Sequence, residues 1–479
     1  MESYIMKTAS LFYIDGKWVE PASAEMSDLI DPATETPYAR AAMGSAEDVD
    51  RAAKAARRAF ASYSKSSVEE RIALLERIAV IFERRQREFA ETVTQEVGMP
   101  ISISGTALID WCKAHTAATI EILRKFEFAE KLGTTTVYKE PIGVVGMITP
   151  WNWPIGQIFT KILPALATGC TMVLKPSQLT PLDAVLVAEV LDEAGVPAGV
   201  FNLVNGEGHT VGDAISTHPE IDMVSFTGST RAGIQIGKAS ADTIKRVVTE
   251  LGGKSANIIL DDADFPTAIE SAVAGCFFIN GQACDAGTRL LVPRGRVEET
   301  LKLAAAAAER NVIGSPADPK TTLGPVINKN QFERVQHLIL TALDEGASLV
   351  TGGLGRPDGL KAGYYVKPTI FANVEPSMTV YREEIFGPVL SVIAYDDLDD
   401  AIRIANDTVY GLAAHITGKD MDVVQRLARE VRAGSVFVNS PDLDPMAPFG
   451  GYRQSGNGRE NGEYGFHDFL EVKAVVGHG

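Results

Sequence analysis

Over most of its length the chain alternates between short continuous apolar stretches and segments with helical periodicity. Continuous apolar stretches are typical of strands in a parallel sheet that is covered on both faces. Between them, apolar residues recur every three or four positions, as on one face of a helix. The expected strands after Pro141 are 142–148, 171–174, 200–204 and 223–226, with a helix at 181–194. This order predicts an α/β unit.

A second alternating set follows the first. Its expected strands include 289–292 and 435–438, and its expected helices lie near 265–279, 297–309, 329–345 and 398–406. A chain of 479 residues is too long for one ordinary domain, so two α/β units fit its length. Ahead of both units, residues 45–96 show helical periodicity and residues 11–14 indicate a short strand.

Two segments fit neither unit. Residues 119–141 and the tail from residue 454 each contain a strand-like piece, at 134–138 and 470–476. Unpaired strand edges of this kind need a partner.

The composition limits the possible functions of the chain more than it limits the possible folds. The formal net charge of -17 repels phosphate backbones and argues against a nucleic-acid partner. No apolar stretch approaches the ~18 residues of a membrane span, and the N-terminus lacks a secretory pattern. The cysteines form no paired motif for zinc or for a disulfide framework. We therefore expect a cytoplasmic protein with no metal, no membrane partner and free thiols.

The stretch from Phe277 to Cys284 is the first candidate site. A helix-like apolar run ends at Asn280-Gly281, and a lone cysteine follows. A cysteine after a tight turn can be exposed and nucleophilic, because nearby backbone N–H groups stabilise its thiolate. A free cysteine is more often a small buried hydrophobic residue, so this motif alone does not decide the role of Cys284.

Two polar residues lie where expected strands end. Glu250 precedes Gly252-Gly253, and a glutamate can act as a general base when its pKa is tuned. Asn152 follows the strand at 142–148, at the end of the sheet where ligands bind, and its amide could donate to an oxyanion. Taken singly, Glu250 could equally be a surface acid and Asn152 a turn former.

A glycine motif completes the set. Gly228 and Gly233 open a helix after the strand at 223–226. A helix N-terminus at the end of a strand suits a pyrophosphate. The spacing is wider than in the usual dinucleotide fingerprint, so the motif is a weak signal by itself.

In this order the four motifs resemble the aldehyde dehydrogenase superfamily. Several independent motifs at family-like separations make the resemblance specific. It implies an α/β fold with a Rossmann-like cofactor domain, an α/β catalytic domain and a small β oligomerisation element. It runs from Ile14-Asp15-Gly16-Lys17-Trp18 to Gly458-Arg459-Glu460 and includes Lys175-Pro176-Ser177, Glu383-Glu384-Ile385-Phe386-Gly387-Pro388 and Pro448-Phe449-Gly450-Gly451-Tyr452.

The resemblance also implies domain boundaries and an assembly. Residues 1–118 and 142–252 would form the NAD(P)-binding domain, and 253–453 the catalytic domain. Residues 119–141 and 454–479 would be oligomerisation segments. Closed symmetry then makes a homodimer or a homotetramer the expected assembly.

The activity implied is the NAD(P)-dependent oxidation of an aldehyde to its carboxylic acid. Cys284 would attack the carbonyl to give a thiohemiacetal, and Asn152 with the Cys284 backbone N–H would hold the oxyanion. Hydride transfer to the nicotinamide would leave a thioester, which water activated by Glu250 would hydrolyse. Lys161 matches a family lysine near the oxyanion site.

Residues for NAD or NADP and for the substrate follow from the same resemblance. The expected cofactor residues are Trp151, Lys175, Ser177, Gln178, Gly228, Ser229, Gly233, Leu251, Gln331, Glu384 and Phe386. The expected substrate tunnel is lined by Trp153, Gln157, Thr160, Phe278, Asp285 and Phe449. The aromatic members of the tunnel favour a medium-chain aliphatic or an aromatic aldehyde.

Two positions depart from the family pattern. Gln178 stands where many NAD-preferring relatives carry a glutamate, whose charge repels a 2′-phosphate, so we expect NADP to be tolerated better here. Asp285 follows the nucleophile, where small neutral residues are commoner. An acid that faces Cys284 would disfavour the thiolate, whereas one that points elsewhere would add polarity to the substrate pocket.

Three other functions compete with this one. Relatives that transfer the acyl group to CoA generally lack the base that Glu250 matches. A binding protein on the same fold would have little reason to keep Cys284, Glu250 and Asn152 together. A cysteine hydrolase would need a histidine beside its nucleophile, and the seven histidines lie in none of the motifs.

Overall fold

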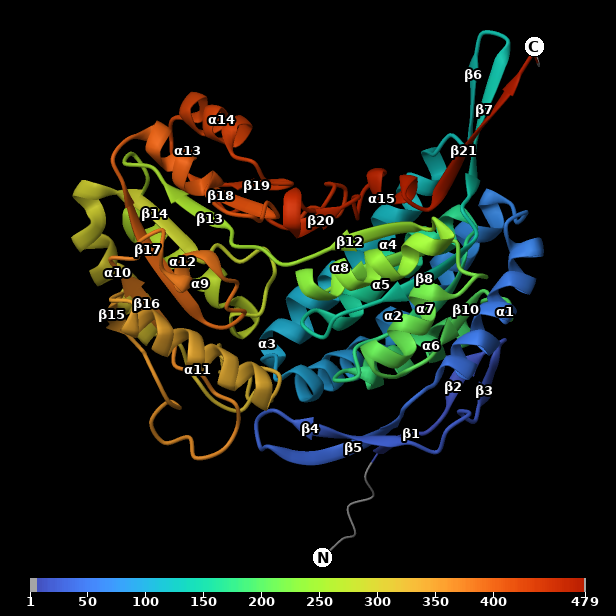
Figure 1. Ribbon diagram of the computed structural model, residues 1–479, viewed down its shortest axis with the longest axis horizontal. Helices are drawn as coiled ribbons and strands as arrows, with labels where there is room; N and C mark the ends of the chain where they lie inside the picture. The colour runs from blue at the N-terminus through green and yellow to red at the C-terminus, as the bar shows by residue number, and fades with distance from the viewer. Residues whose placement is uncertain (1–6, 478–479) are drawn as a thin grey trace, which may run out of the picture.

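Two units, each built on a largely parallel sheet with helices on both faces, lie side by side in the computed structural model (Figure 1). The α/β fold expected from the hydrophobic pattern is thereby confirmed. The structure describes residues 7–477. Residues 1–6 and 478–479, which belong to the predicted segments 1–118 and 454–479, lie outside the described residues.

The first sheet has eight strands. In spatial order they are β20 (Gly456–Asn457), β12 (Arg246–Glu250), β11 (Met223–Thr227), β8 (Val144–Ile148), β9 (Thr171–Lys175), β10 (Phe201–Leu203), β2 (Phe12–Ile14) and β3 (Lys17–Val19). The five strands from β12 to β10 are parallel. The chain order reverses between β8 and β11, which makes their carboxyl ends the switch point where open α/β sheets bind ligands.

Helices cover both faces of this sheet because its central strands are apolar on both sides. Val145 and Met147 of β8 join one core, and Val144 and Ile148 join the core on the opposite face. The first core is completed by α2 (Val68–Val97), α4 (Ile109–Lys125), α5 (Pro154–Thr168) and α6 (Pro181–Glu193), and the second by α1 (Ala46–Tyr63), α7 (Asp213–Thr217) and α8 (Thr230–Ser240).

The second sheet has seven strands, all parallel except for the antiparallel edge strand β15. In order they are β15 (Ser348–Thr351), β16 (Thr369–Ala372), β17 (Val389–Tyr395), β14 (Arg289–Pro293), β13 (Ala256–Ile259), β18 (Ala413–Thr417) and β19 (Ser435–Val438). Helices α9 (Phe265–Gly281) and α10 (Val297–Glu309) pack on one face, and α11 (Lys329–Asp344), α12 (Thr379–Arg382), α13 (Leu398–Asn406) and α14 (Met421–Glu430) on the other.

A three-stranded antiparallel sheet projects from the first unit (Figure 1). It pairs β21 (Leu470–Val476) with β7 (Thr135–Pro141) and β7 with β6 (Ala129–Leu132). The two segments that fitted neither unit therefore pair with each other. Residues 119–125 are the last turns of α4 and pack into the first core, so the projection begins after them.

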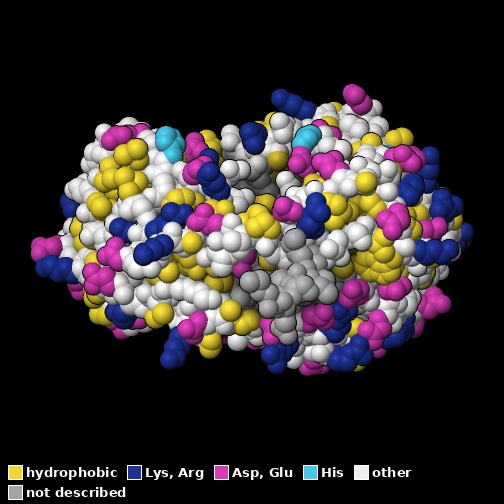
Figure 2. Space-filling view, turned by 90° about the horizontal axis from the view of Figure 1, so that it is seen from below, with side chains coloured by type: hydrophobic (Ala, Val, Ile, Leu, Met, Phe, Trp, Pro, Cys, Tyr) yellow, Lys and Arg dark blue, Asp and Glu magenta, His cyan; other side chains and the backbone are white. Residues whose placement is uncertain are grey.

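The remaining described strands form a small sheet of β1 (Lys7–Ala9), β5 (Thr36–Ala42) and β4 (Met26–Asp31). On the face seen in Figure 2, acidic and basic side chains are interspersed. Within residues 7–477, none of the helices combines the length and apolar character that a membrane span needs.

Candidate active site

The predicted site residues meet where the carboxyl ends of the first sheet face the second unit. Trp151 and Asn152 follow β8, Lys175 ends β9, and Glu250 ends β12. Cys284 lies on the loop between α9 and β14 of the second unit. Side chains from both units thus converge at the switch point of the first sheet.

The loop that carries Cys284 starts from a distorted end of α9. Ile279 and Asn280 have left-handed backbone angles (φ 50° and 60°), a rare conformation for a β-branched residue such as Ile279. The Asn280 side chain holds this turn, because Nδ2 donates to the carbonyls of Gly98 (3.0 Å) and Pro325 (2.8 Å). Tertiary hydrogen bonds therefore stabilise the strained turn that directs the chain toward Cys284.

Asn152 is bonded into the same loop. Its Nδ2 donates to the Gln282 carbonyl at 2.8 Å, and both residues are buried. A primary amide carries two N–H donors, so one N–H can hold the loop while the other points elsewhere. The Gln282 side chain also accepts from the backbone N–H of Ile327 at 2.9 Å. Asn152 is therefore bonded to the loop two residues before the candidate nucleophile.

Cys284 is partly buried, whereas Cys112, Cys170 and Cys276 are fully buried. Burial raises the pKa of the Cys284 thiol well above its usual range, and the negative charges of Glu250, Asp285 and Glu384 add to the effect. The backbone N–H of Cys284 lowers the pKa but is outweighed. The backbone N–H thus favours the thiolate as expected, but desolvation and the nearby carboxylates have the larger effect on the pKa.

The raised pKa of Cys284 bears on whether Asp285 disfavours the thiolate or adds polarity to the substrate pocket. Its negative charge raises the pKa of Cys284, as the first alternative required. The backbone carbonyl of Asp285 lies 3.0 Å from Nε2 of His415, which fixes the position of this residue on the loop. Asp285 thus helps to keep the neighbouring sulfur protonated.

Glu250 has the environment expected of a tuned base. Its side chain is 2% exposed, and neither carboxyl oxygen has a hydrogen-bond partner among the described residues. Burial raises its pKa well above the usual range, the charge of Glu460 raises it further, and the Lys161 ammonium opposes both. A carboxyl group in this state binds its proton more tightly than a surface acid and is a stronger base once ionised.

Lys161 forms a buried ion pair that the sequence did not predict. Its ammonium contacts the carboxylate of Glu460 and donates to Ser225 Oγ at 3.2 Å. Lys161 lies on α5 and Glu460 lies after β20, 299 positions further along the chain. The motif Gly458-Arg459-Glu460 marked the end of the family resemblance, but nothing in the chain indicated that Glu460 would reach Lys161.

We expect Lys161→Met to destabilise the protein by about 3–5 kcal/mol, because it leaves the Glu460 carboxylate buried without its partner. The double variant Lys161→Met/Glu460→Gln should recover most of the loss. Urea unfolding measures the free energy of unfolding of the single and the double variant. Lys302→Met, which removes an exposed partner of Glu298, is the matched control and should cost less than about 0.5 kcal/mol. If Lys161→Met lost less free energy of unfolding than Lys302→Met, this explanation of the ion pair would be contradicted.

The ends of β11 and β12 fit a dinucleotide pyrophosphate. The backbone N–H of Gly228 donates to the Glu250 carbonyl at 3.0 Å, and Ser229 caps α8 by accepting from Ala232 N–H at 3.3 Å. A Cβ at Gly233 would come within 2.8 Å of the Leu251 side chain, so glycine lets α8 pack close to the strand end. An eleven-residue helix that starts here presents its positive end to an anion.

Lys175 and Ser177 lie at the end of β9. Lys175 is buried, its Nζ donates to the Pro176 carbonyl at 2.9 Å, and burial lowers its pKa to about 8. Ser177 Oγ accepts from Leu179 N–H at 3.2 Å, and Gln178 between them is partly exposed. The Lys175 ammonium and the Ser177 hydroxyl can both donate, which suits a ribose hydroxyl or a phosphate near the adenosine end of a dinucleotide.

The loop before β17 supplies the remaining cofactor residues. Glu384 accepts from Gly253 N–H at 3.1 Å, and burial raises its pKa to about 7. Gln331 Nε2 donates to the carbonyls of Ile385 (3.1 Å) and Phe386 (2.7 Å), so it positions this loop. The Phe386 ring meets the Trp151 ring edge to face at 5.3 Å. A carboxylate beside two aromatic rings fits a nicotinamide ribose.

The predicted substrate residues lie on or just before α5, near the end of α9, and on the loops that carry Asp285 and Phe449. The rings of Trp153 and Phe278 are 5.8 Å apart, and Gln157 Oε1 is buried without a hydrogen-bond partner in the described part of the chain. Phe449 is partly exposed and pairs through its backbone with Glu460. The Thr160 hydroxyl donates to the Gly156 carbonyl at 2.8 Å, and Thr160 lines a small cavity together with Glu460.

A Rossmann-like sheet with a loop cysteine and a buried glutamate near its switch point is typical of a dinucleotide-dependent oxidoreductase. The model of the aldehyde dehydrogenase family matches residues 18–475, and the chain belongs to this family. It is an NAD(P)-dependent aldehyde dehydrogenase, and the family resemblance seen in the sequence is confirmed.

Individual relatives match over almost the whole chain. The 3-succinoylsemialdehyde-pyridine dehydrogenase of a Pseudomonas species is 49% identical over 468 residues, which is 98% of each protein. Aldehyde dehydrogenase C from Pseudomonas syringae, solved as a variant with NAD+ and octanal, has a TM-score of 0.98 at 49% identity, over 98% of this chain and 97% of that chain. Betaine aldehyde dehydrogenase from Staphylococcus aureus, solved with NAD+, has a TM-score of 0.95 at 37% identity, over 98% and 95%.

Proposed function

We propose that this enzyme oxidises its aldehyde through a thiohemiacetal and a thioester on Cys284. The observation that carries the proposal is the convergence of three groups: the Cys284 loop, the Asn152 amide bonded into that loop, and the buried, unpaired carboxyl of Glu250. A nucleophile, an amide donor and a base gathered in this way support acyl transfer through the cysteine.

In the first step the Cys284 thiol releases its proton to solvent, and the thiolate attacks the aldehyde carbon. The negative charge moves to the carbonyl oxygen, where the second N–H of Asn152 and the backbone N–H of Cys284 can stabilise it. Loss of hydride from the thiohemiacetal carbon to a bound dinucleotide would then leave the thioester. Trp151, Lys175, Glu384 and the N-terminus of α8 are the groups of this chain that would hold the dinucleotide.

In the second step the thioester is hydrolysed. The Glu250 carboxylate accepts a proton from water as the water oxygen attacks the acyl carbon, and Cys284 leaves as the thiolate. Lys161 and Glu460 set the charge around Glu250, because the ammonium lowers its pKa and the carboxylate raises it. The buried ion pair is therefore a positioning element for the base.

We infer that the substrate is a medium-chain aliphatic or an aromatic aldehyde. The packed rings of Trp153 and Phe278 offer an apolar wall. Two relatives support this substrate class, since one is named for a pyridine semialdehyde and another was solved with octanal.

A substrate panel tests this inference. We expect kcat/KM for octanal and benzaldehyde to exceed that for betaine aldehyde by at least roughly 100-fold, because desolvating a permanent positive charge in an apolar tunnel costs more than cation–π attraction to two rings returns. Reduced-cofactor absorbance follows all three reactions. A preference for betaine aldehyde would contradict the assignment.

Gln178 offers a test of cofactor choice. A neutral amide at this position does not repel a 2′-phosphate, whereas a carboxylate would. We expect Gln178→Glu to lower the ratio of kcat/KM for NADP to that for NAD by at least about tenfold, the effect of roughly 1.4 kcal/mol of repulsion. Glu189→Gln, which removes a charge on α6 that pairs with Arg85 of α2, is the control. An unchanged ratio in Gln178→Glu would show that residue 178 does not face the 2′ position.

We also propose that the projecting sheet joins copies of this chain into a dimer or a tetramer. Leu132, Val472 and Val476 on its strands are 54%, 71% and 77% exposed in the single chain. Exposed apolar residues on strands with free edges suit a contact with a second copy. Light scattering at micromolar concentration should give at least twice the chain mass of 51.4 kDa. A monomer would disprove this assembly.

A further inference from the structure

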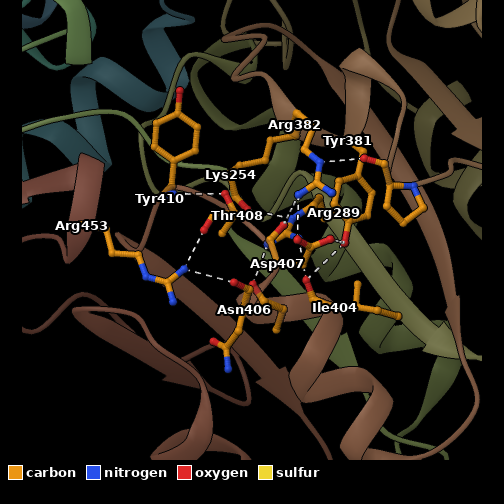
Figure 3. Close-up of polar contacts among 12 residues, drawn as sticks. Lys254, Arg289, Tyr381, Arg382, Ile404, Asn406, Asp407, Thr408, Tyr410 and Arg453 are labelled. Atoms are coloured by element: carbon orange, nitrogen blue, oxygen red, sulfur yellow. Dashed lines mark hydrogen bonds and ion pairs between the residues drawn. The ribbon is translucent and has the colours of Figure 1, made fainter.

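The loop that carries Cys284 is anchored on both sides of the nucleophile by long-range hydrogen bonds. Asn152 donates to the backbone carbonyl two residues before Cys284. Arg289 begins β14 just after the loop, and its guanidinium donates to the carbonyls of Lys254 (2.9 Å) and Ile404 (2.8 Å) (Figure 3). The segment between these two anchors carries the nucleophile, so the position of the sulfur depends on what else contacts this segment.

His415 supplies a hydrogen bond in the middle of the segment. Its Nε2 lies 3.0 Å from the backbone carbonyl oxygen of Asp285, the residue after Cys284. A carbonyl oxygen can only accept, so Nε2 carries the proton in this contact and donates it. His415 lies on β18 of the second sheet, whereas Asn152 belongs to the first unit. The nucleophile is therefore flanked by one donor from each unit.

The imidazole ring of His415 is itself held in place. The strand register sets His415 beside Asn257 of β13 and Phe437 of β19, so the three side chains share one face of the sheet. The rings of His415 and Phe437 are stacked, with centroids 5.1 Å apart and 21° between their planes. The loop packs closely here, since a Cβ added to Gly287 would lie 2.9 Å from Asn257 Cβ and 3.2 Å from His415 Cδ2. Stacking and packing therefore fix the direction of the Nε2–H group.

The backbone next to the sulfur also has little room. A Cβ added to Gly253 would come within 2.7 Å of the Cys284 carbonyl oxygen, so the crossing segment between the two sheets lies directly against the nucleophile. The Asp285 carbonyl, one peptide further on, is the group that His415 holds. Two successive peptide groups that follow the Cys284 side chain are thus constrained from different sides.

We propose that His415 is a positioning residue for the nucleophile. By holding the Asp285 carbonyl, it fixes the direction of Cys284 Sγ and of the Cys284 backbone N–H toward the aldehyde carbonyl. This role rests on the thioester mechanism through Cys284 proposed above. A displacement of about 1 Å between reacting atoms can cost roughly 100-fold in rate, so the loss of this one donor should be visible in the kinetics.

Two substitutions separate the hydrogen bond from the ring packing. His415→Phe keeps a ring for the stack on Phe437 but removes the donor, whereas His415→Gln keeps an N–H of similar reach. We expect kcat/KM for octanal, which reports the steps up to the thioester, to fall about 10- to 100-fold in His415→Phe and to stay within about threefold of the wild type in His415→Gln. His337→Phe, at an exposed position of α11, is the control and should change the value by less than about twofold.

Two further readouts distinguish positioning from other roles. The KM for NAD should stay within about twofold in His415→Phe, because the substitution leaves the groups expected to hold the dinucleotide in place. Nε2 carries its proton whether or not Nδ1 is protonated, so His415→Phe should lower the rate by the same factor at every pH tested. A change in the shape of the pH profile would instead make His415 a base, which would overturn the positioning role.

The variants also separate this proposal from the mechanism on which it rests. Full activity in His415→Phe, or equal losses in His415→Phe and His415→Gln, would overturn the positioning role even when Cys284→Ala is inactive. Activity retained in Cys284→Ala would disprove the thioester mechanism itself. Should His415→Phe fail to fold, His415→Met, which also lacks a donor, takes its place in the comparison with His415→Gln.

Discussion

Replacing Cys284 with alanine should reduce aldehyde-dependent formation of the reduced cofactor by roughly 10⁴-fold or more, because no other group in the site can form the thioester. The substitution removes one partly exposed sulfur, so the fold should persist. Initial rates with a good substrate measure the loss. Circular dichroism and binding of the cofactor show that the site is otherwise intact.

Cys276→Ala is the matched control. Cys276 lies on the same helix that leads to Cys284, but it is fully buried, and burial raises its pKa to about 12. We expect its removal to change the rate by less than about threefold, since it contributes packing rather than chemistry. Full activity in Cys284→Ala would disprove covalent catalysis at this position, and equal losses in both variants would point to a shared structural cause.

Replacing Glu250 with glutamine should lower kcat by roughly 10²–10⁴-fold, the usual contribution of a general base. Glutamine has a similar shape but cannot accept the proton of the attacking water. Stopped-flow measurement should still show a burst of about one reduced cofactor per active site, because hydride transfer precedes hydrolysis. A kcat close to that of the wild type would rule out Glu250 as the base for hydrolysis.

The pH dependence of the wild type follows from the same carboxyl. Its pKa is raised, so the protonated, inactive form persists to higher pH than for an ordinary glutamate. We expect kcat to rise with pH through this apparent pKa and the rise to vanish in Glu250→Gln. Glu460→Gln should shift the rise toward lower pH, because it removes a negative charge and leaves the Lys161 ammonium.

Much of the fold follows from the sequence alone. The strands β8, β9 and β11 are buried at every position. Each therefore appears in the sequence as a largely apolar stretch, which can be recognised without knowledge of the fold. The helix predicted at 297–309 has the bounds of α10. By contrast, β6 is exposed at all four positions and gives no apolar signal, so only its pairing with β7 identifies it.

The candidate site likewise has features that the sequence predicts and features that only the structure shows. Cys284, Glu250 and Asn152 stand out in the sequence because each occupies a recognisable motif next to a strand or helix end. The sequence thereby determined the family and the candidate chemistry. Only the tertiary structure decided that Glu460 pairs with Lys161, that Cys284 binds its proton tightly, and that Lys254 Nζ is buried without a hydrogen-bond partner among the described residues. These properties depend on desolvation and on distances between charges from separate elements, which no local pattern along a chain contains.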